Sequence, residues 1–284
     1  MGGLPSTTRP PLEVFVRLST MLRITSPSNE KVKRVRALLE QRKARRAYRQ
    51  MVLEGPRLID EALRFSAQHP DFRPVFAFYG DPTPRAQETL ARLQAAGVPC
   101  YEVTPAILQM CTEAETPQGL IAVAPIPELP WPELSTFLVL LDRVQEPGNV
   151  GAVLRSAAAA GAEGVVIPPG TADPWHPKAV RAAAGAHFVL PVRLASWMEI
   201  PRLLEGTTIW LAMPTGAHAY FEVDWRAPVT LILGGEAAGP GPEAQRLPHR
   251  TVRIPMARGM ESLNVAVAGA LLLYEVARQR GLVK

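Results

Sequence analysis

Three glycine-rich segments in the C-terminal half carry the side chains best suited to chemistry. They are DRVQEPGNVGAVLRSA (142–157), LILGGEAAGPGPE (231–243) and IPMARGMESLNVAVAGALLLYE (254–275). Each contains or directly follows a short apolar run that is typical of a strand. Ligands of open α/β sheets lie beyond the carboxyl ends of the strands. The segments are therefore predicted to meet at one ligand site.

The first segment combines an amide and a guanidinium at the start of a predicted helix. Asn149 is expected to cap that helix with its side-chain oxygen, and Gly151 and Arg155 share a face because they lie four residues apart. The missing side chain at Gly151 would let a ligand approach the helix and reach the guanidinium. Helix N-termini favour anions such as an RNA phosphate. A capped helix with a solvated arginine is the alternative interpretation.

The other two segments place polar groups beside flexible backbone. Gly234 and Gly235 allow the backbone to approach a ligand closely. Glu236 follows them and could either accept hydrogen bonds from loop amides or orient a substrate hydroxyl. Ser262 is the predicted N-cap of the long C-terminal helix, with Asn264 in its first turn. That helix is apolar nearly all round, which predicts burial in a core or at a subunit contact.

The elements that must position these segments form an open α/β sheet with helices on both faces. Its expected strands lack polar alternation, as in a parallel sheet covered on both sides. They are Phe137–Leu141, Gly164–Ile167, Phe188–Val192, Ile209–Met213, Val229–Leu233 and Val252–Ile254. The most regular predicted helices are Val150–Ala160 and Leu263–Arg280.

The N-terminal part of the chain predicts a second, smaller unit. Residues 22–124 alternate helical and strand patterns, which indicates a compact α/β domain. Residues 125–133 contain four prolines, which cannot continue a helix or a central strand. We therefore expect a linker there and a second domain over 134–284. Residues 1–21 show no periodicity and are expected to be a flexible tail, with Met21 as an alternative native start.

Positive charge is concentrated early in the chain. The net charge is +5, and between positions 31 and 49 nine basic side chains face one acid, Glu40. Val32, Val35 and Leu39 form an apolar stripe at helical spacing, so the basic side chains are free to face outward. Clustered basic residues bind RNA phosphates by releasing counterions; a solvated basic helix is the alternative. The predicted RNA contacts are Lys31, Lys33, Arg34, Arg42, Arg45, Arg46 and Arg49.

Several functional classes are excluded by composition and by missing motifs. The chain of 284 residues is 47% hydrophobic with only two cysteines, so it is globular and carries no disulfide scaffold. It lacks the dinucleotide, P-loop and nucleophile-elbow motifs, and its five histidines are dispersed, so no metal site is expected. It has no apolar run long enough to cross a membrane and a poor secretory signal. We expect a cytoplasmic protein.

Together, the three segments resemble the signature motifs of the SpoU (TrmH) family of RNA ribose 2′-O-methyltransferases, within the SPOUT class. PGNVGAVLRSA resembles the first motif, LILGGEAAGPG the second, and IPMARGMESLNVAVAGALLLYE the third. The resemblance runs through about residues 137–280, with order and spacing in agreement. Residues 22–124, with EGPRLIDEAL, resemble the RNA-binding substrate domain of some members.

This resemblance implies a trefoil knot in the C-terminal sheet, S-adenosylmethionine as cofactor, a homodimer, and RNA as substrate. Ribosomal RNA is the first expectation and tRNA the second. The implied cofactor-binding residues are Gly234, Gly235, Ile254, Met256 and Leu263. The implied catalytic residues are Asn149, Arg155, Glu236, Ser262 and Asn264. Arg155 would activate the ribose hydroxyl either directly as a base or by clamping the adjacent phosphate. A guanidinium is nearly always protonated, so electrostatic activation and positioning is the favoured alternative. A nucleotide-binding oxidoreductase and a non-catalytic RNA-binding protein are the rival hypotheses.

Overall fold

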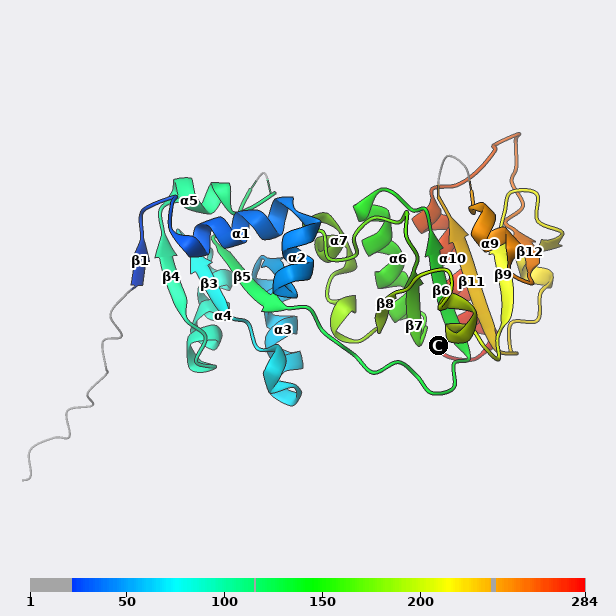
Figure 1. Ribbon diagram of the computed structural model, residues 1–284, viewed down its shortest axis with the longest axis horizontal. Helices are drawn as coiled ribbons and strands as arrows, with labels where there is room; N and C mark the ends of the chain where they lie inside the picture. The colour runs from blue at the N-terminus through cyan, green and yellow to red at the C-terminus, as the bar shows by residue number, and fades with distance from the viewer. Residues whose placement is uncertain (1–21, 115, 236–238, 284) are drawn as a thin grey trace, which may run out of the picture.

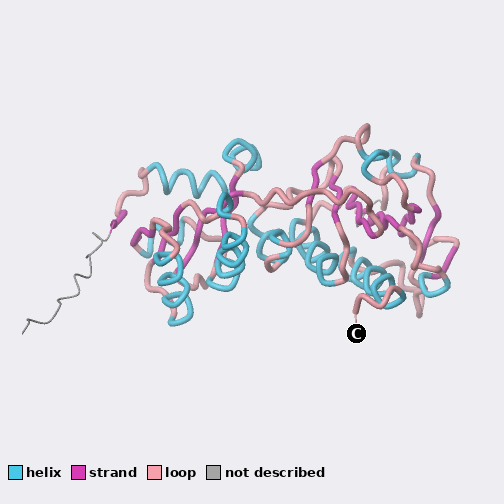
Figure 2. The backbone as a smooth tube through the Cα atoms, turned by 90° about the horizontal axis from the view of Figure 1, so that it is seen from below, coloured by secondary structure: helices cyan, strands magenta, loops and turns pink. Residues whose placement is uncertain are grey.

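The computed structural model describes residues 22–114, 116–235 and 239–283, which form two α/β units (Figure 1). The tail predicted at residues 1–21 and the candidate Glu236 lie outside the described residues. Figure 2 shows the same two units from below, connected by an extended loop. No helix within the described residues has the length and apolarity needed to cross a membrane.

The smaller unit is built on a mixed five-stranded sheet with helices on both faces. In spatial order its strands are β1 (Leu22–Ile24), β4 (Cys100–Val103), β3 (Phe76–Tyr79), β5 (Leu120–Pro125) and β2 (Gln50–Glu54). The helices are α1 (Glu30–Glu40), α2 (Arg42–Tyr48), α3 (Pro56–Gln68), α4 (Pro84–Ala95) and α5 (Pro105–Met110). Hydrophobic side chains of α1 and α5 pack on one face of the sheet, and those of α3 and α4 pack on the other.

The larger unit is built on a parallel seven-stranded sheet. This sheet is predicted from apolar runs that lack alternating polar residues. The strand order is β10 (His218–Ala219), β12 (Arg250–Arg253), β9 (Thr208–Ala212), β11 (Val229–Gly234), β6 (Phe137–Asp142), β7 (Gly164–Ile167) and β8 (Val192–Leu194). The helices are α6 (Pro147–Ala159), α7 (Pro177–Ala183), α8 (Ile200–Leu203), α9 (Pro242–Arg246) and α10 (Val265–Gln279).

Burial on both faces explains why the strands of this sheet are apolar throughout. Along β6, Phe137 and Val139 point into the cluster that contains α6 and α10, whereas Leu138 and Leu140 point into the cluster with α8 and α9. Successive strand residues face opposite sides of a sheet, so both sides need hydrophobic residues here. The trefoil knot stays a prediction, because strand order and register do not define how the chain threads.

Two local predictions are wrong. The strand expected at Phe188–Val192 begins only at Val192, because Ala186–Phe188 form a 3₁₀ helix and the Phe188 ring packs on Phe65 with centroids 5.6 Å apart. The single basic helix is two helices, since Gln41 between them has an extended backbone with φ −119° and ψ 115°. Its predicted apolar stripe is confirmed, with Val32, Val35 and Leu39 buried.

The two units share buried contacts as well as the proline-rich segment. Val180 and Phe188 of the larger unit belong to the same hydrophobic cluster as Met51 and Leu53 of the smaller sheet. Arg181 of α7 also forms an ion pair with Glu54 at the end of β2, with 3.2 Å between Nη1 and Oε2. The division of the chain into independent domains at 125–133 therefore stays a prediction, although the two sheets are distinct.

Candidate active site

A cleft of about 460 Å³ opens at the carboxyl ends of β9, β11 and β12. All five predicted cofactor residues line it, namely Gly234, Gly235, Ile254, Met256 and Leu263. Ser262 lines it too, with Glu261 and Gln245, which the sequence interpretation did not single out. Small-molecule sites typically measure about 300–1,000 Å³. The topology therefore brings the second and third glycine-rich segments together at one ligand-sized cleft.

The glycine pair in this cleft serves a packing need that the sequence did not reveal. A Cβ on Gly234 would lie 2.3 Å from the backbone N of Pro240, and one on Gly235 would lie 2.2 Å from the carbonyl oxygen of Arg143. These distances are shorter than any real contact of a Cβ, so only glycine fits at both positions. Gly234 lets Pro240 pack closely against the end of β11, and Gly235 lets the backbone after β6 cross there, while both residues line the cleft.

Asp142 and Arg143 hold the same crossing in place and were missed by the sequence interpretation. Asp142 is buried at the end of β6, and its Oδ2 accepts a hydrogen bond of 2.6 Å from the backbone N–H of Gly241. Burial raises the pKa of Asp142, and the Gly241 hydrogen bond opposes that rise. Arg143 adopts a left-handed backbone with φ +58°. The available signal was a charged pair directly after a buried strand.

Two predicted catalytic side chains contact each other at the start of two helices. Asn264 is the N-cap of α10, and its Oδ1 accepts hydrogen bonds from the backbone N–H groups of Ala266 and Val267 at 2.9 and 3.3 Å. Its Nδ2 donates to Oδ1 of Asn149 over 3.1 Å. The structure thus joins the first and third segments through a pair of amides.

The predicted helix caps are wrong in register. Asn149 lies in the first turn of α6, which begins at Pro147 and is capped by Glu146. Ser262 does not cap α10, because that role belongs to Asn264. Both errors have one cause: residues near the true cap have side chains that also suit a helix start, and sequence alone does not rank them.

Arg155 is exposed on α6 and has no hydrogen-bond or ion-pair partner among the residues the structure describes. It is also not one of the described residues that line the cleft. The expected gap at Gly151 is absent: a Cβ there would lie 2.2 Å from the carbonyl oxygen of Ala179, so α7 fills this space. The prediction that Gly151 admits a ligand is wrong, whereas Arg155 stays available to an external anion.

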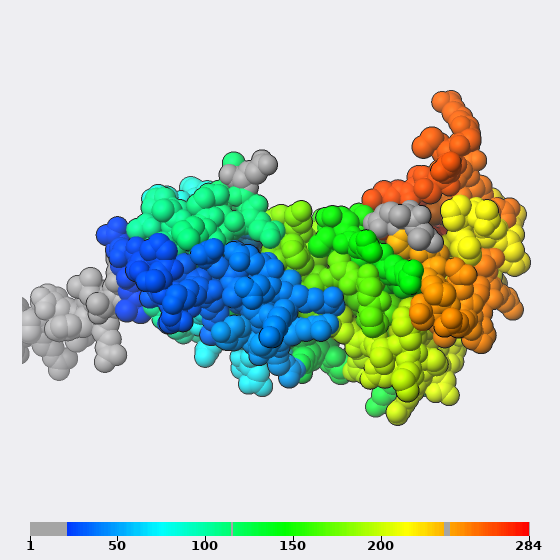
Figure 3. All heavy atoms as spheres, turned by 45° about the horizontal axis from the view of Figure 1, so that its top comes forward, coloured from blue at the N-terminus to red at the C-terminus, as the bar shows by residue number. Residues whose placement is uncertain are grey.

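The predicted RNA-binding residues of α1 and α2 differ in exposure. Lys33, Arg46 and Arg49 are exposed, and Arg49 forms an ion pair with Glu128. Lys31, Arg34 and Arg42 are partly buried. Figure 3 shows the blue atoms of this segment spread over one face of the smaller unit.

Arg45 is a correction to that set. It is 2% exposed, and its Nε donates to Oδ2 of Asp173 in the larger unit over 2.7 Å. Its Nη1 donates to the carbonyl oxygens of Leu38 and Leu39 at 2.6 and 3.0 Å. A guanidinium that is buried and paired with a carboxylate in this way cannot lie against an RNA phosphate. Arg45 instead fastens the two units together.

Comparisons with known proteins agree with this architecture. The pattern of the SpoU rRNA Methylase family matches residues 136–274, and that of the MRM3-like substrate binding domain matches residues 29–122. The chain is 34% identical to the 23S rRNA (guanosine(2553)-2′-O)-methyltransferase RlmP of Bacillus subtilis, over 90% of this chain and 99% of that protein. The chain belongs to the SpoU rRNA methylase family.

Solved structures of methyltransferases superimpose over both units. The AdoMet-bound rRNA methyltransferase of Sinorhizobium meliloti is 30% identical and superimposes with a TM-score of 0.79, over 93% of this chain and 99% of that one. AviRb of Streptomyces viridochromogenes, in complex with AdoMet, is 29% identical with a TM-score of 0.75, over 90% of this chain and all of that one. The predicted SPOUT class and the α/β architecture of both units are confirmed.

Proposed function

We propose that this SpoU methylase transfers a methyl group from S-adenosylmethionine to a ribose 2′-hydroxyl of ribosomal RNA. The observation that carries the proposal is the glycine-walled cleft at the carboxyl ends of β9, β11 and β12, beside the Asn149–Asn264 amide pair. RlmP acts on 23S rRNA according to its name, and the two structural relatives above are described with AdoMet bound. Ribosomal RNA is therefore favoured over tRNA.

The residues of the cleft fit this cofactor. Its walls combine apolar side chains such as Ile254 and Met256 with the side-chain-free backbone of Gly234 and Gly235, a combination that suits an adenosyl group with hydrogen-bonding edges. Leu263 would complete the set that holds the cofactor. S-adenosylmethionine supplies an electrophilic methyl group on a sulfonium, whose transfer requires no metal. The described residues contain no group of three or more acidic, histidine or cysteine side chains placed to bind a metal.

The remaining chemistry is the activation and placement of a poor nucleophile. Arg155 is permanently charged and has only donors, so it would bind the phosphate next to the reacting ribose and favour loss of the 2′-hydroxyl proton. Asn149 and Asn264 hold each other and the start of α10 in place, and would orient the ribose beside the cleft. Ser262 at the cleft mouth and Glu236 complete the proposed surround.

The deciding experiment follows tritium from methyl-labelled S-adenosylmethionine into RNA transcripts. Unmodified 23S rRNA should accept the label, and the labelled position should resist alkaline cleavage because a 2′-O-methyl group blocks it. A tRNA transcript should accept much less. Label in a base, or transfer to neither RNA, would overturn the proposal. Stronger labelling of tRNA would replace rRNA with tRNA as the substrate.

A thermal-unfolding experiment tests the rival oxidoreductase. Stabilisation of the folded protein by NAD instead of S-adenosylhomocysteine would favour an oxidoreductase.

We also infer that the protein is a homodimer and acts in the cytoplasm. Val267, Leu271 and Tyr274 are 50%, 41% and 45% exposed on one face of α10, at the spacing of a helical stripe. A second copy would cover this stripe. The V267E substitution should lower the mass measured by light scattering to that of a monomer. L134E, at an isolated exposed leucine, should not. A monomeric wild type would overturn this inference.

A further inference from the structure

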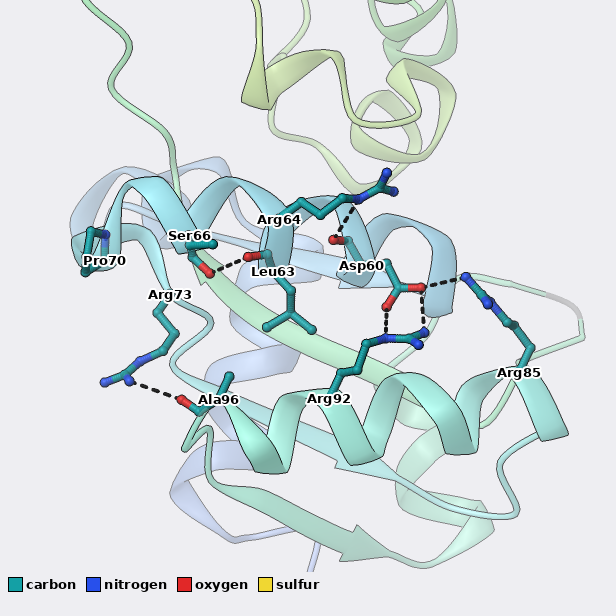
Figure 4. Close-up of a pocket in the computed structure, with 10 residues that line it drawn as sticks. Asp60, Leu63, Arg64, Ser66, Pro70, Arg73, Arg85, Arg92 and Ala96 are labelled. Carbon is teal, nitrogen blue, oxygen red and sulfur yellow. Dashed lines mark hydrogen bonds and ion pairs between the residues drawn. The ribbon is translucent and has the colours of Figure 1, made fainter.

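A groove of about 670 Å³ runs between α3 and α4 of the smaller unit (Figure 4). Its charged lining consists of four arginines, Arg64, Arg73, Arg85 and Arg92, and a single acid, Asp60. The arginines are spread from one end of the groove to the other, and Asp60 lies between Arg85 and Arg92 (Figure 4). This positive surface is separate from the basic segment on α1 and α2.

Asp60 holds two of these guanidinium groups in fixed positions. Its Oδ1 accepts from Nε of Arg92 at 3.1 Å, and its Oδ2 accepts from Nη2 of Arg92 at 3.0 Å and from Nη2 of Arg85 at 2.8 Å. The Asp60 side chain is 9% exposed, whereas those of Arg92 and Arg85 are 47% and 59% exposed. The buried acid therefore orders the arginines and leaves them open to solvent.

The residues that line the groove have spare charged donors and no spare carboxylate. Two acids outside the lining, Glu61 and Glu88, each pair with one arginine, Arg64 and Arg85. Arg92 uses Nε and Nη2, so its Nη1 is available, and the hydrogen bonds of Arg64 likewise involve only Nε and Nη2. Arg73 uses Nη1 for the carbonyl oxygen of Ala96. Both oxygens of Asp60 are occupied. Guanidinium groups with free donors bind phosphate oxygens through short, charge-assisted hydrogen bonds, so the matching ligand is an anion with several acceptors.

We infer that the α3–α4 groove is a second surface for the phosphate backbone of the substrate RNA. The inference rests on the proposed function, because that function supplies the polyanion. A spread array of arginines suits successive phosphates of one strand, and the apolar groove residues Leu63, Pro70 and Ala96 can lie against the sugars and bases. Because α3 and α4 cover the sheet face opposite α1, the RNA contacts both faces of this unit.

The test compares two double variants that lose the same charge. Arg64→Gln with Arg73→Gln removes two groove arginines without touching the side-chain pairs of Asp60. Arg57→Gln with Arg202→Gln is the control, because both arginines are exposed and neither lines the groove. The probe is an unmodified 23S rRNA transcript, and the measurement is the slope of log affinity against log salt. Each lost phosphate contact should reduce this slope by about 0.7–0.9, so the groove variant should lose about 1.5 and the control much less.

Equal slopes for the two double variants would overturn the groove. Should the groove variant fail to fold, Arg73→Gln is compared with Arg73→Lys, and equal slopes for these two would also overturn it. Methyl transfer by the wild type to the same transcript is measured in parallel. If the wild type transfers no methyl group but the groove variant still has a smaller salt slope than the control variant, only the proposed function is refuted. A wild type that methylates while the slopes agree would refute the groove alone.

Discussion

Folding brings the predicted residues of the cleft in the larger unit together, whereas it gives the basic residues of the smaller unit different surroundings. All five residues predicted to hold the cofactor line the same cleft. In the basic segment, the seven predicted RNA contacts separate into exposed, partly buried and fully buried side chains. Glycine positions are set by backbone geometry that leaves few alternatives, whereas a long cationic side chain takes its role from whatever the fold places beside it.

The largest expected effect tests the catalytic side of this comparison. Arg155→Ala should reduce methyl transfer to 23S rRNA by about 10²–10³-fold, the usual cost of removing one donor that stabilises developing negative charge. Affinity for S-adenosylhomocysteine should stay normal, because Arg155 is not among the described residues of the cleft. Single-turnover tritium transfer and calorimetry measure the two quantities, with Arg202→Ala as control. Transfer within a few-fold of wild type would remove Arg155 from the mechanism.

The second effect tests whether Arg45 is structural. Arg45→Met should destabilise the protein by about 3–5 kcal/mol, because it leaves the buried Asp173 carboxylate unpaired. The double variant Arg45→Met with Asp173→Leu should recover most of that loss. Arg46→Met, at the exposed neighbour, should change stability by less than about 0.5 kcal/mol. Urea denaturation measures all three, and equal behaviour of Arg45→Met and Arg46→Met would contradict the buried-pair role.

A third effect tests the glycine wall. Gly235→Ala should cost about 1–3 kcal/mol of stability, because its Cβ would collide with the carbonyl oxygen of Arg143. It should also weaken binding of S-adenosylhomocysteine by distorting the cleft. Gly148→Ala is the matched control, since its Cβ would meet only the Glu146 side chain at 3.3 Å. Thermal unfolding and calorimetry distinguish them; unchanged binding by Gly235→Ala would show that the wall tolerates a side chain.

The smallest effect tests the exposed part of the basic segment. Lys33→Gln with Arg46→Gln should leave stability and cofactor binding unchanged, because both side chains are exposed. The salt slope of 23S rRNA binding should fall by about 1.5, as two phosphate contacts are lost. The pair Arg57→Gln with Arg202→Gln serves again as control. A slope identical to that of the control would remove these exposed residues of α1 and α2 from the RNA surface.

The sequence by itself determined the features that repeat along the chain or depend on backbone freedom. Apolar runs without alternation established a parallel sheet covered on both faces, and the three motifs identified the family and the residues of the cleft. Helix existence was predicted well, but helix starts were not: Glu146 and Asn264 are the caps where Asn149 and Ser262 were expected. Neighbouring residues of similar capping ability compete, and local sequence does not decide between them.

Only the tertiary structure decided which polar groups face water and which face each other. Asp173 lies far along the chain from Arg45, and its approach turned a predicted RNA contact into a buried link between the two units. The Asn149–Asn264 pair also joins segments that are more than a hundred residues apart, with a separation of 115 positions. Such pairings arise when helices and loops from distant parts of the chain pack against each other. The sequence specifies the charge of a residue, but the tertiary structure determines which group that residue contacts.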